Sequence, residues 1–177
     1  TVTDDTLTDV GTLTINVATV NDAPVASDDT ISATEDTLFT SSVDLDFNDT
    51  DLDGDSLSVV AGTFATTQSG SLVLAVDGSY TYTPALNFNG ADSVNYTVTD
   101  DTLTDVGTLT INVAATNDAP VANADAGTAV EDGNVVVNVL VNDTDVDGTI
   151  DATSVVITTA VSNGTTSVNT KTGAVTY

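Results

Sequence analysis

The sequence predicts an all-β protein made of β-sandwich domains joined in tandem, and three observations support this. Residues 1–18 recur letter for letter as residues 97–114, an offset of 96 residues that matches one independent domain rather than a solenoid repeat. Apolar and polar residues alternate along much of the chain, whereas helical spacing is nowhere sustained. Threonine and valine, which favour strands, are abundant throughout.

The repeat divides the chain into three pieces. Residues 1–20 carry the C-terminal strands of a preceding repeat, residues 21–116 form one complete repeat, and residues 117–177 form the N-terminal part of a following repeat that lacks its last strands. The boundaries fall at the matching tetrapeptides NDAP, which begin at Asn21 and Asn117. Proline keeps the preceding residue extended and marks a strand end, so we expect short linkers that hold neighbouring domains close.

The first strands expected in the complete repeat lie at residues 43–47 and 57–59. Apolar residues occupy every second position there, with Val43, Leu45 and Phe47 followed by Leu57 and Val59. Alternation of this kind is typical of strands with one buried face.

A hairpin is expected next, because residues 72–76 and 80–82 alternate on either side of Asp77-Gly78. This dipeptide suits the positive φ of a tight reversal. Its interior residues are Leu72, Leu74, Val76, Tyr80 and Tyr82. In the third unit Thr172-Gly173 stands at the same place, followed by Val175 and Tyr177.

The last two strands are expected at residues 94–98 and 109–113. Their interior residues are Val94, Tyr96, Val98, Leu109, Ile111 and Val113. About seven short strands in ~96 residues, with frequent turns, describe a Greek-key β-sandwich of immunoglobulin-like type. The pattern leaves the order of the strands open.

The charge of the chain excludes two classes of partner. There are 27 acidic residues and one basic residue, Lys171, and the net charge is −26. Nothing in the chain can neutralise phosphate, so nucleic acid and anionic membrane surfaces are excluded. No apolar run approaches the ~20 residues that span a bilayer, so we expect no membrane insertion of this region.

Catalysis is not expected from this composition. Cysteine and histidine are absent, so disulfides, thiolate metal sites and the usual nucleophile and base pairs cannot form. A glycosidase-like pair of carboxylates normally lies in an aromatic-lined cleft. Aromatic residues make up only 5% of this chain, and tryptophan is absent.

Two matching clusters of aspartate are the strongest functional signal. Residues 48–55 read NDTDLDGD, residues 142–148 read NDTDVDG, and Asp151 is the candidate equivalent of Asp55. Like charges ~4 Å apart repel by ~4 kcal/mol near a protein surface. No basic side chain is available to offset this repulsion, so a cation is the physical solution, and oxygen ligands favour Ca²⁺.

Two other interpretations of the clusters fit the sequence less well. An EF-hand is rejected, because Val60 stands where the loop needs its bidentate glutamate and no helices flank the segment. Acidity that serves solubility alone would scatter the carboxylates and use more glutamate. Only Glu35 and Glu131 are glutamate here, and the aspartates cluster at matching places.

Four segments in this order resemble cadherin-type repeats, and more closely the cadherin-like tandem repeats of giant RTX-type bacterial surface adhesins. They are TED at residues 34–36, DLDGD at 51–55, VNYTVTD at 94–100, and NV at 112–113 leading into NDAP at 117–120. The resemblance covers essentially the whole chain.

The resemblance implies Ca²⁺ between successive domains, bound by the linker, by the lower end of one domain and by two loops at the upper end of the next. The first junction would then use Asn21, Asp22, Asp51, Asp53, Asp55 and Asp100. The second would use Glu35, Asn117, Asp118, Asp145 and Asp147, with Asp36 and Asp151 as further candidates. The chain departs from the family at Asn87 and Asn89, where cadherins carry a further acidic pair.

These expectations give a Ca²⁺-rigidified extender of a bacterial adhesin, located on the cell surface or secreted, whose partners are neighbouring repeats of the same polypeptide. Two alternatives stay open. The unit could itself adhere, through homophilic contact or to a glycan, or it could be a secreted filament subunit in which residues 1–20 complete a neighbouring molecule. A chain cut from a longer array is the simpler interpretation of its ends.

Overall fold

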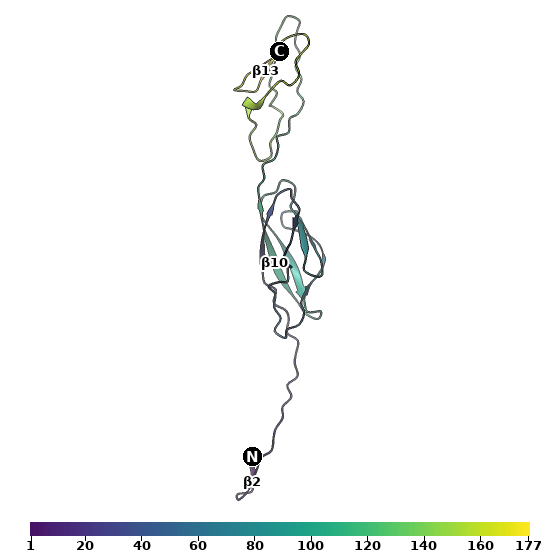
Figure 1. Ribbon diagram of the computed structural model, residues 1–177, viewed down its shortest axis with the longest axis vertical. Coiled ribbons are helices and arrows are strands. Elements are labelled where there is room, and N and C mark those ends of the chain that lie inside the picture. Colours follow the sequence, from purple (N-terminus) through teal and green to yellow (C-terminus); the bar gives the residue numbers. More distant parts are fainter.

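The computed structural model describes all 177 residues and confirms an all-β chain, in which the one helical element is a single 3₁₀ turn at Ala152–Ser154. Figure 1 shows an elongated molecule in which an N-terminal arm, a central sandwich and a smaller C-terminal unit follow one another along the long axis. No helix has the length and apolar character required to cross a membrane.

The complete repeat folds as two four-stranded sheets. The first has the order β3-β10-β9-β5 and the second the order β4-β8-β7-β6. The strands of the first sheet are β3 (Asp29–Thr34), β10 (Thr104–Ala114), β9 (Gly90–Thr99) and β5 (Ser58–Val59). Those of the second sheet are β4 (Phe39–Thr40), β8 (Tyr80–Thr83), β7 (Ser71–Leu74) and β6 (Gly62–Ala65). All neighbours are antiparallel except β3 and β10, which are parallel.

The core lies between the sheets and draws on alternate residues of both. Most of the interior residues expected from the sequence are buried there, which confirms the alternation. They are Leu45, Val59, Leu72, Leu74, Tyr80, Tyr82, Val94, Tyr96, Val98, Leu109, Ile111 and Val113, to which the structure adds Ala33. Leu57 is partly buried against this cluster.

The expected strand at residues 43–47 is wrong. Only Leu45 is buried, whereas Val43 and Phe47 are exposed. The segment forms turns, with the Phe47 N–H donating to the Asp44 carbonyl, because aspartates between the apolar residues favour turns over a ladder. The turns lie against Gly78, where an added Cβ would come within 2.5 Å of the Asp46 carboxylate.

Val76 is a second correction, because it is 64% exposed. β7 ends at Leu74, and the reversal occupies Ala75 to Ser79, closed by an Ala75 N–H bond to the Ser79 carbonyl. The alternation therefore continues in the sequence beyond the point at which the strand ends.

The arm repeats a small part of the sandwich without its core. β1 (Val2–Thr3) pairs Val2 with Asp9 of β2 (Thr8–Asp9), as Val98 pairs with Asp105 in the β9–β10 hairpin. Residues 1–20 are exposed along their whole length.

The C-terminal unit contains β11 (Val136–Val137), β12 (Ser167–Val168) and β13 (Val175–Thr176) in the order β11-β13-β12. The turn expected at Thr172-Gly173 is confirmed, since Gly173 has φ +71° and its N–H donates to the Asn169 carbonyl. Few of its side chains are buried, and Ala174 is the unit's contribution to the buried apolar residues.

Candidate metal centre

By the upper end of a domain we mean the end at which the chain enters it, which points toward the N-terminal arm in Figure 1. In the middle domain this end is shaped by the first aspartate cluster. The Asp51 Oδ1 accepts hydrogen bonds from the backbone N–H groups of Asp53 (2.8 Å) and Asp55 (3.3 Å), so the side chain folds the loop around itself. Gly54 has φ +78° at the centre of this loop. The linker is tied to the loop by the Asp22 N–H, which donates to the Asp53 Oδ2 at 2.7 Å.

Three carboxylates meet at this end. Asp51, Asp55 and Asp100 each offer an oxygen, and these oxygens lie within 4.8 Å of one another. The Oδ2 of Asp51 is buried and has no hydrogen-bond partner. A buried carboxylate oxygen without a donor is costly in an acidic cluster, and it is the arrangement that a cation would satisfy.

Asp100 is held rigidly in this group and is only 8% exposed. The Leu103 N–H donates to its Oδ1 at 2.6 Å, and the Asn21 amide donates to its Oδ2 at 2.7 Å. These hydrogen bonds, that from Leu103 above all, hold the pKa of Asp100 well below its usual value, so the group stays ionised. Asn21 also donates to the Thr102 hydroxyl, a residue that sequence reasoning missed.

The upper end of the C-terminal unit repeats this construction. The Asp145 Oδ1 accepts from the Asp147 N–H (3.2 Å) and the Gly148 N–H (2.7 Å), and the Asp118 N–H points at the Asp147 carboxylate. Asn117 donates to the Asp118 carbonyl at 2.7 Å, as Asn21 does to that of Asp22. The same local sequence therefore builds two similar loops, which differ in that Gly54 has a positive φ and Gly148 does not.

The lower end of the middle domain presents Glu35 and Asp36, in a turn that follows β3. Glu35 is only 2% exposed, and its carboxylate accepts the Thr116 N–H and the Asn89 amide, the latter at 3.3 Å. Asp36 has φ +55° and accepts the Asn87 N–H at 2.9 Å. The two asparagines thus lie directly beside the acidic pair.

Both domains meet at Asp118. Desolvation raises the pKa of this carboxyl, and the charges of Asp36, Asp147, Glu35 and Asp145 raise it further. The Asp118 Oδ2 is buried without a partner. Four carboxylates from two domains therefore act on Asp118, but, unlike those of Asp51, Asp55 and Asp100, these groups do not bring their oxygens within 4.8 Å of one another.

Asp151 does not join this group in the structure. Its Oδ1 accepts from the Thr153 N–H at 2.8 Å and caps the 3₁₀ turn. It is absent from the charges that act on Asp118, so its expected equivalence to Asp55 stays a prediction.

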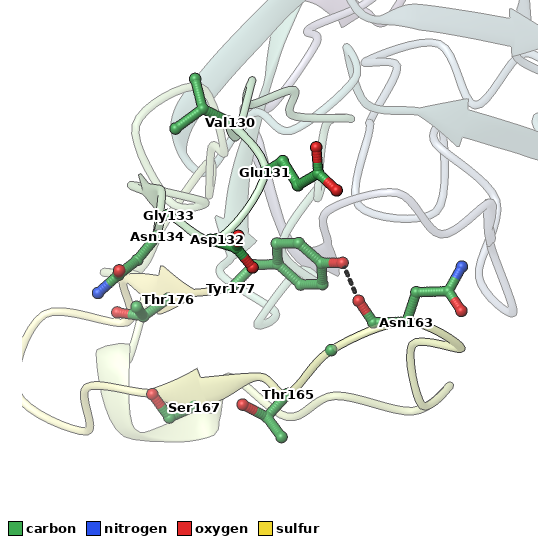
Figure 2. Close-up of a pocket in the computed structure, with 11 residues that line it drawn as sticks. Val130, Glu131, Asp132, Gly133, Asn134, Asn163, Thr165, Ser167, Thr176 and Tyr177 are labelled. Atoms are coloured by element: carbon green, nitrogen blue, oxygen red, sulfur yellow. Dashed lines mark hydrogen bonds between the residues drawn. The ribbon is translucent and has the colours of Figure 1, made fainter.

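A cavity of about 600 Å³ lies elsewhere, in the C-terminal unit. Figure 2 shows Glu131 and Asp132 at its edge, and the Tyr177 hydroxyl bonded to the Asn163 carbonyl. Asp132 has φ +62°, so this pair forms the same turn as Glu35 and Asp36. The cavity carries no unpartnered buried carboxylate, so we place the candidate centre at the junctions.

A β-sandwich with acidic residues at both ends is typical of domains that occur in tandem arrays. The family of bacterial cadherin-like domains matches residues 21–115, which is more than half of the chain, and the chain belongs to this family. The family of bacterial Ig domains matches residues 117–177. Domains of these kinds are typically non-enzymatic structural modules of surface proteins, and cadherin-like domains usually bind Ca²⁺.

Solved structures give weaker similarities. The endo-fucoidan hydrolase MfFcnA4 from glycoside hydrolase family 107 is 21% identical, with a TM-score of 0.40, over 52% of this chain and 14% of that chain. A variant of the same enzyme is 22% identical, with a TM-score of 0.40, over 53% of this chain and 14% of that chain. The chain therefore spans about a seventh of that enzyme's length. No curated protein matches the chain.

Proposed function

We propose that the chain is part of a Ca²⁺-rigidified extender of a bacterial cell-surface adhesin, in which ions at the junctions hold successive domains in line. The observation that carries the proposal is the meeting of Asp51, Asp55 and Asp100, whose oxygens lie within 4.8 Å of one another beside the linker that enters the middle domain. A ligand shared by two domains restrains their relative orientation as well as their folding.

The residues fit the chemistry of this ion. Asp118 and Asp51 each offer a buried oxygen without a hydrogen-bond partner, and all the candidate donors are oxygens of carboxylates or amides. Such donors suit Ca²⁺ at 2.3–2.6 Å rather than zinc or copper. Asp51, Asp55 and Asp100 would hold an ion at the first junction, and Asp118 with its four neighbours at the second.

The expected stabilisation follows from mass action. Extracellular sites have dissociation constants of about 10⁻⁴ to 10⁻³ M, so 10 mM Ca²⁺ stabilises the bound form by roughly 1.4–2.7 kcal/mol per site. For a domain of ~95 residues this raises the melting temperature by roughly 6–20 °C. Neighbouring repeats are then the partners, and the array is stiff outside the cell, where Ca²⁺ is plentiful.

Calorimetric melting with Ca²⁺, with chelator, and with Mg²⁺ at equal ionic strength tests the proposal. Mg²⁺ controls for charge screening, since it demands a stricter octahedral geometry. Asp118→Asn should lose most of the Ca²⁺-dependent increase in the maximum dimension of the chain, measured by X-ray scattering. Asp77→Asn makes the same change of charge in an exposed hairpin and should leave the response intact. Equal responses to the two cations, or from the two variants, would refute the role of the junction.

A further inference from the structure

Asn89 occupies an unusual chemical position at the second junction. It is exposed, it precedes Gly90 at the start of β9, and its side-chain amide donates to the buried Glu35 carboxylate at 3.3 Å. Gly90 has φ +120°, a conformation open only to glycine, and an added Cβ would meet no atom nearer than the Phe88 ring at 3.7 Å. Glycine at residue 90 therefore places no side chain beside the backbone nitrogen that follows Asn89, and this nitrogen lies at the first residue of β9, where Gly90 pairs with Val113.

Asparagine followed by glycine is the sequence that cyclises most readily, because no Cβ obstructs the approach of the backbone nitrogen. The Gly90 nitrogen loses its proton and bonds to the Asn89 Cγ, the bond from Cγ to Nδ2 breaks, and Nδ2 leaves as ammonia. One water then opens the cyclic imide at either carbonyl and yields aspartate or isoaspartate. The net change is one amide and one water converted to one carboxylate and one ammonium ion.

We propose that Asn89 is a site of spontaneous deamidation and that the resulting carboxylate becomes an additional ligand of the second junction. The inference rests on the proposed Ca²⁺ function. Before the reaction, Asn89 supplies Glu35 with a hydrogen-bond donor. Afterwards two carboxylates face each other there, and the only basic residue in the chain, Lys171, is not among the charges that act on Asp118 at this junction.

The added charge changes the response of the junction to Ca²⁺ in a defined direction. Carboxylates ~4 Å apart repel in the absence of a cation, and oxygen sites bind Ca²⁺ more tightly as the charge of their ligands increases. The modified junction is therefore less stable without Ca²⁺ and binds the ion more tightly. An array would stiffen as it ages.

The chain provides an internal reference at Asn163-Gly164. This asparagine is also exposed, and it lies at the cavity of Figure 2, where its carbonyl accepts the Tyr177 hydroxyl. Deamidation at Asn163 adds the same charge outside the second junction. Asn163→Asp therefore separates a local ligand effect from an effect of net charge.

The full chain is incubated at mildly alkaline pH and mapped by mass spectrometry after chymotrypsin cleavage. We expect conversion at Asn89 over days, faster than at Asn21 or Asn117, which precede aspartate. Asn89→Gln keeps the amide but disfavours the five-membered ring, so it should stay unmodified. An Asn89 that stays intact while a short peptide of the same sequence converts would overturn the proposal.

Calorimetric titration with Ca²⁺ completes the test. Asn89→Asp should bind about tenfold more tightly than Asn89→Gln, whereas Asn163→Asp should match the unsubstituted chain. Equal affinities of Asn89→Asp and Asn89→Gln would overturn the inference while leaving the proposed function intact. An absence of Ca²⁺ binding in the unsubstituted chain and in Asn89→Gln would instead refute the proposed function.

Discussion

Tyr82→Phe should lower the stability of the middle domain, because it removes a hydrogen bond to the buried Asp92 carboxylate. Asp92 is 2% exposed and has no basic partner. Its Oδ2 accepts hydrogen bonds from the hydroxyls of Tyr82 (2.8 Å) and Thr66. Its Oδ1 accepts hydrogen bonds of 2.8–2.9 Å from the Thr67 hydroxyl and from the backbone N–H groups of Gln68 and Ser93. Burial raises the pKa of Asp92, but hydrogen bonds from Thr66 and Tyr82 outweigh it, and the pKa is lowered.

The magnitude follows from the kind of bond that is lost. Tyr82→Phe keeps the fully buried ring, so it creates no large cavity and removes one hydrogen bond to a charged group, which is worth about 1.5–3 kcal/mol. The melting temperature should fall by roughly 6–24 °C. In an Asp92→Asn background the same bond joins neutral groups, and Tyr82→Phe should cost only about 0.5–1.5 kcal/mol.

Urea unfolding of the four proteins in this double-mutant cycle provides the measurement. A coupling free energy of about 1 kcal/mol or more is expected at pH 7. Because the folded pKa of Asp92 lies below its ordinary value of 3.8, the contribution of the charge is present above that pH and is lost as the pH falls through the folded pKa. Identical costs of Tyr82→Phe in both backgrounds would refute the role assigned to the charge.

Three further predictions concern stability. Gly107→Ala should destabilise the domain by about 1–3 kcal/mol in urea unfolding, because the new Cβ would come within 2.5 Å of the buried Tyr96 ring; a loss below 0.5 kcal/mol would contradict this. Ile111 is fully buried in the core, so Ile111→Ala should lower the free energy of unfolding by about 2–5 kcal/mol. Ile15 lies in the exposed arm, so Ile15→Ala should leave the melting temperature unchanged. Burial raises the pKa of Asp49, so the ionised carboxylate destabilises the folded state at neutral pH. Asp49→Asn should therefore raise the free energy of unfolding by up to about 1 kcal/mol at pH 7, with no gain below about pH 4, where the carboxyl is protonated in both states.

Alternation predicts a strand correctly where the alternating apolar residues are buried, and wrongly where they lie in exposed turns. Leu109 and Ile111 alternate within a strand held between two neighbours, so the pattern reports a buried face. Phe47 and Val76 extend the same alternation into turns, where the ladder has already ended, and period alone cannot show where hydrogen bonding stops. The parallel pairing of β3 with β10 joins residues far apart in the chain, so local alternation does not predict it.

The candidate site was predictable to a similar extent. The aspartate loops are local, and their positions follow from repeated sequence alone. Thr102 was missed because it contributes a hydroxyl to a turn that gives no metal-ligand signal. The contacts of Asn87 and Asn89 with the acidic pair depend on how two distant turns meet at the lower end of the sandwich.

The parallel pairing of β3 with β10 has a mechanical consequence. The chain enters the middle domain ahead of β3 at its upper end and leaves after β10 at its lower end, and the two strands are joined side by side through six residue pairs. Tension along the array pulls these strands in opposite directions parallel to their length. Their hydrogen bonds are then loaded in shear, all at once rather than one after another. The domain should therefore resist a force along the array far better than a force that separates the two strands from one end.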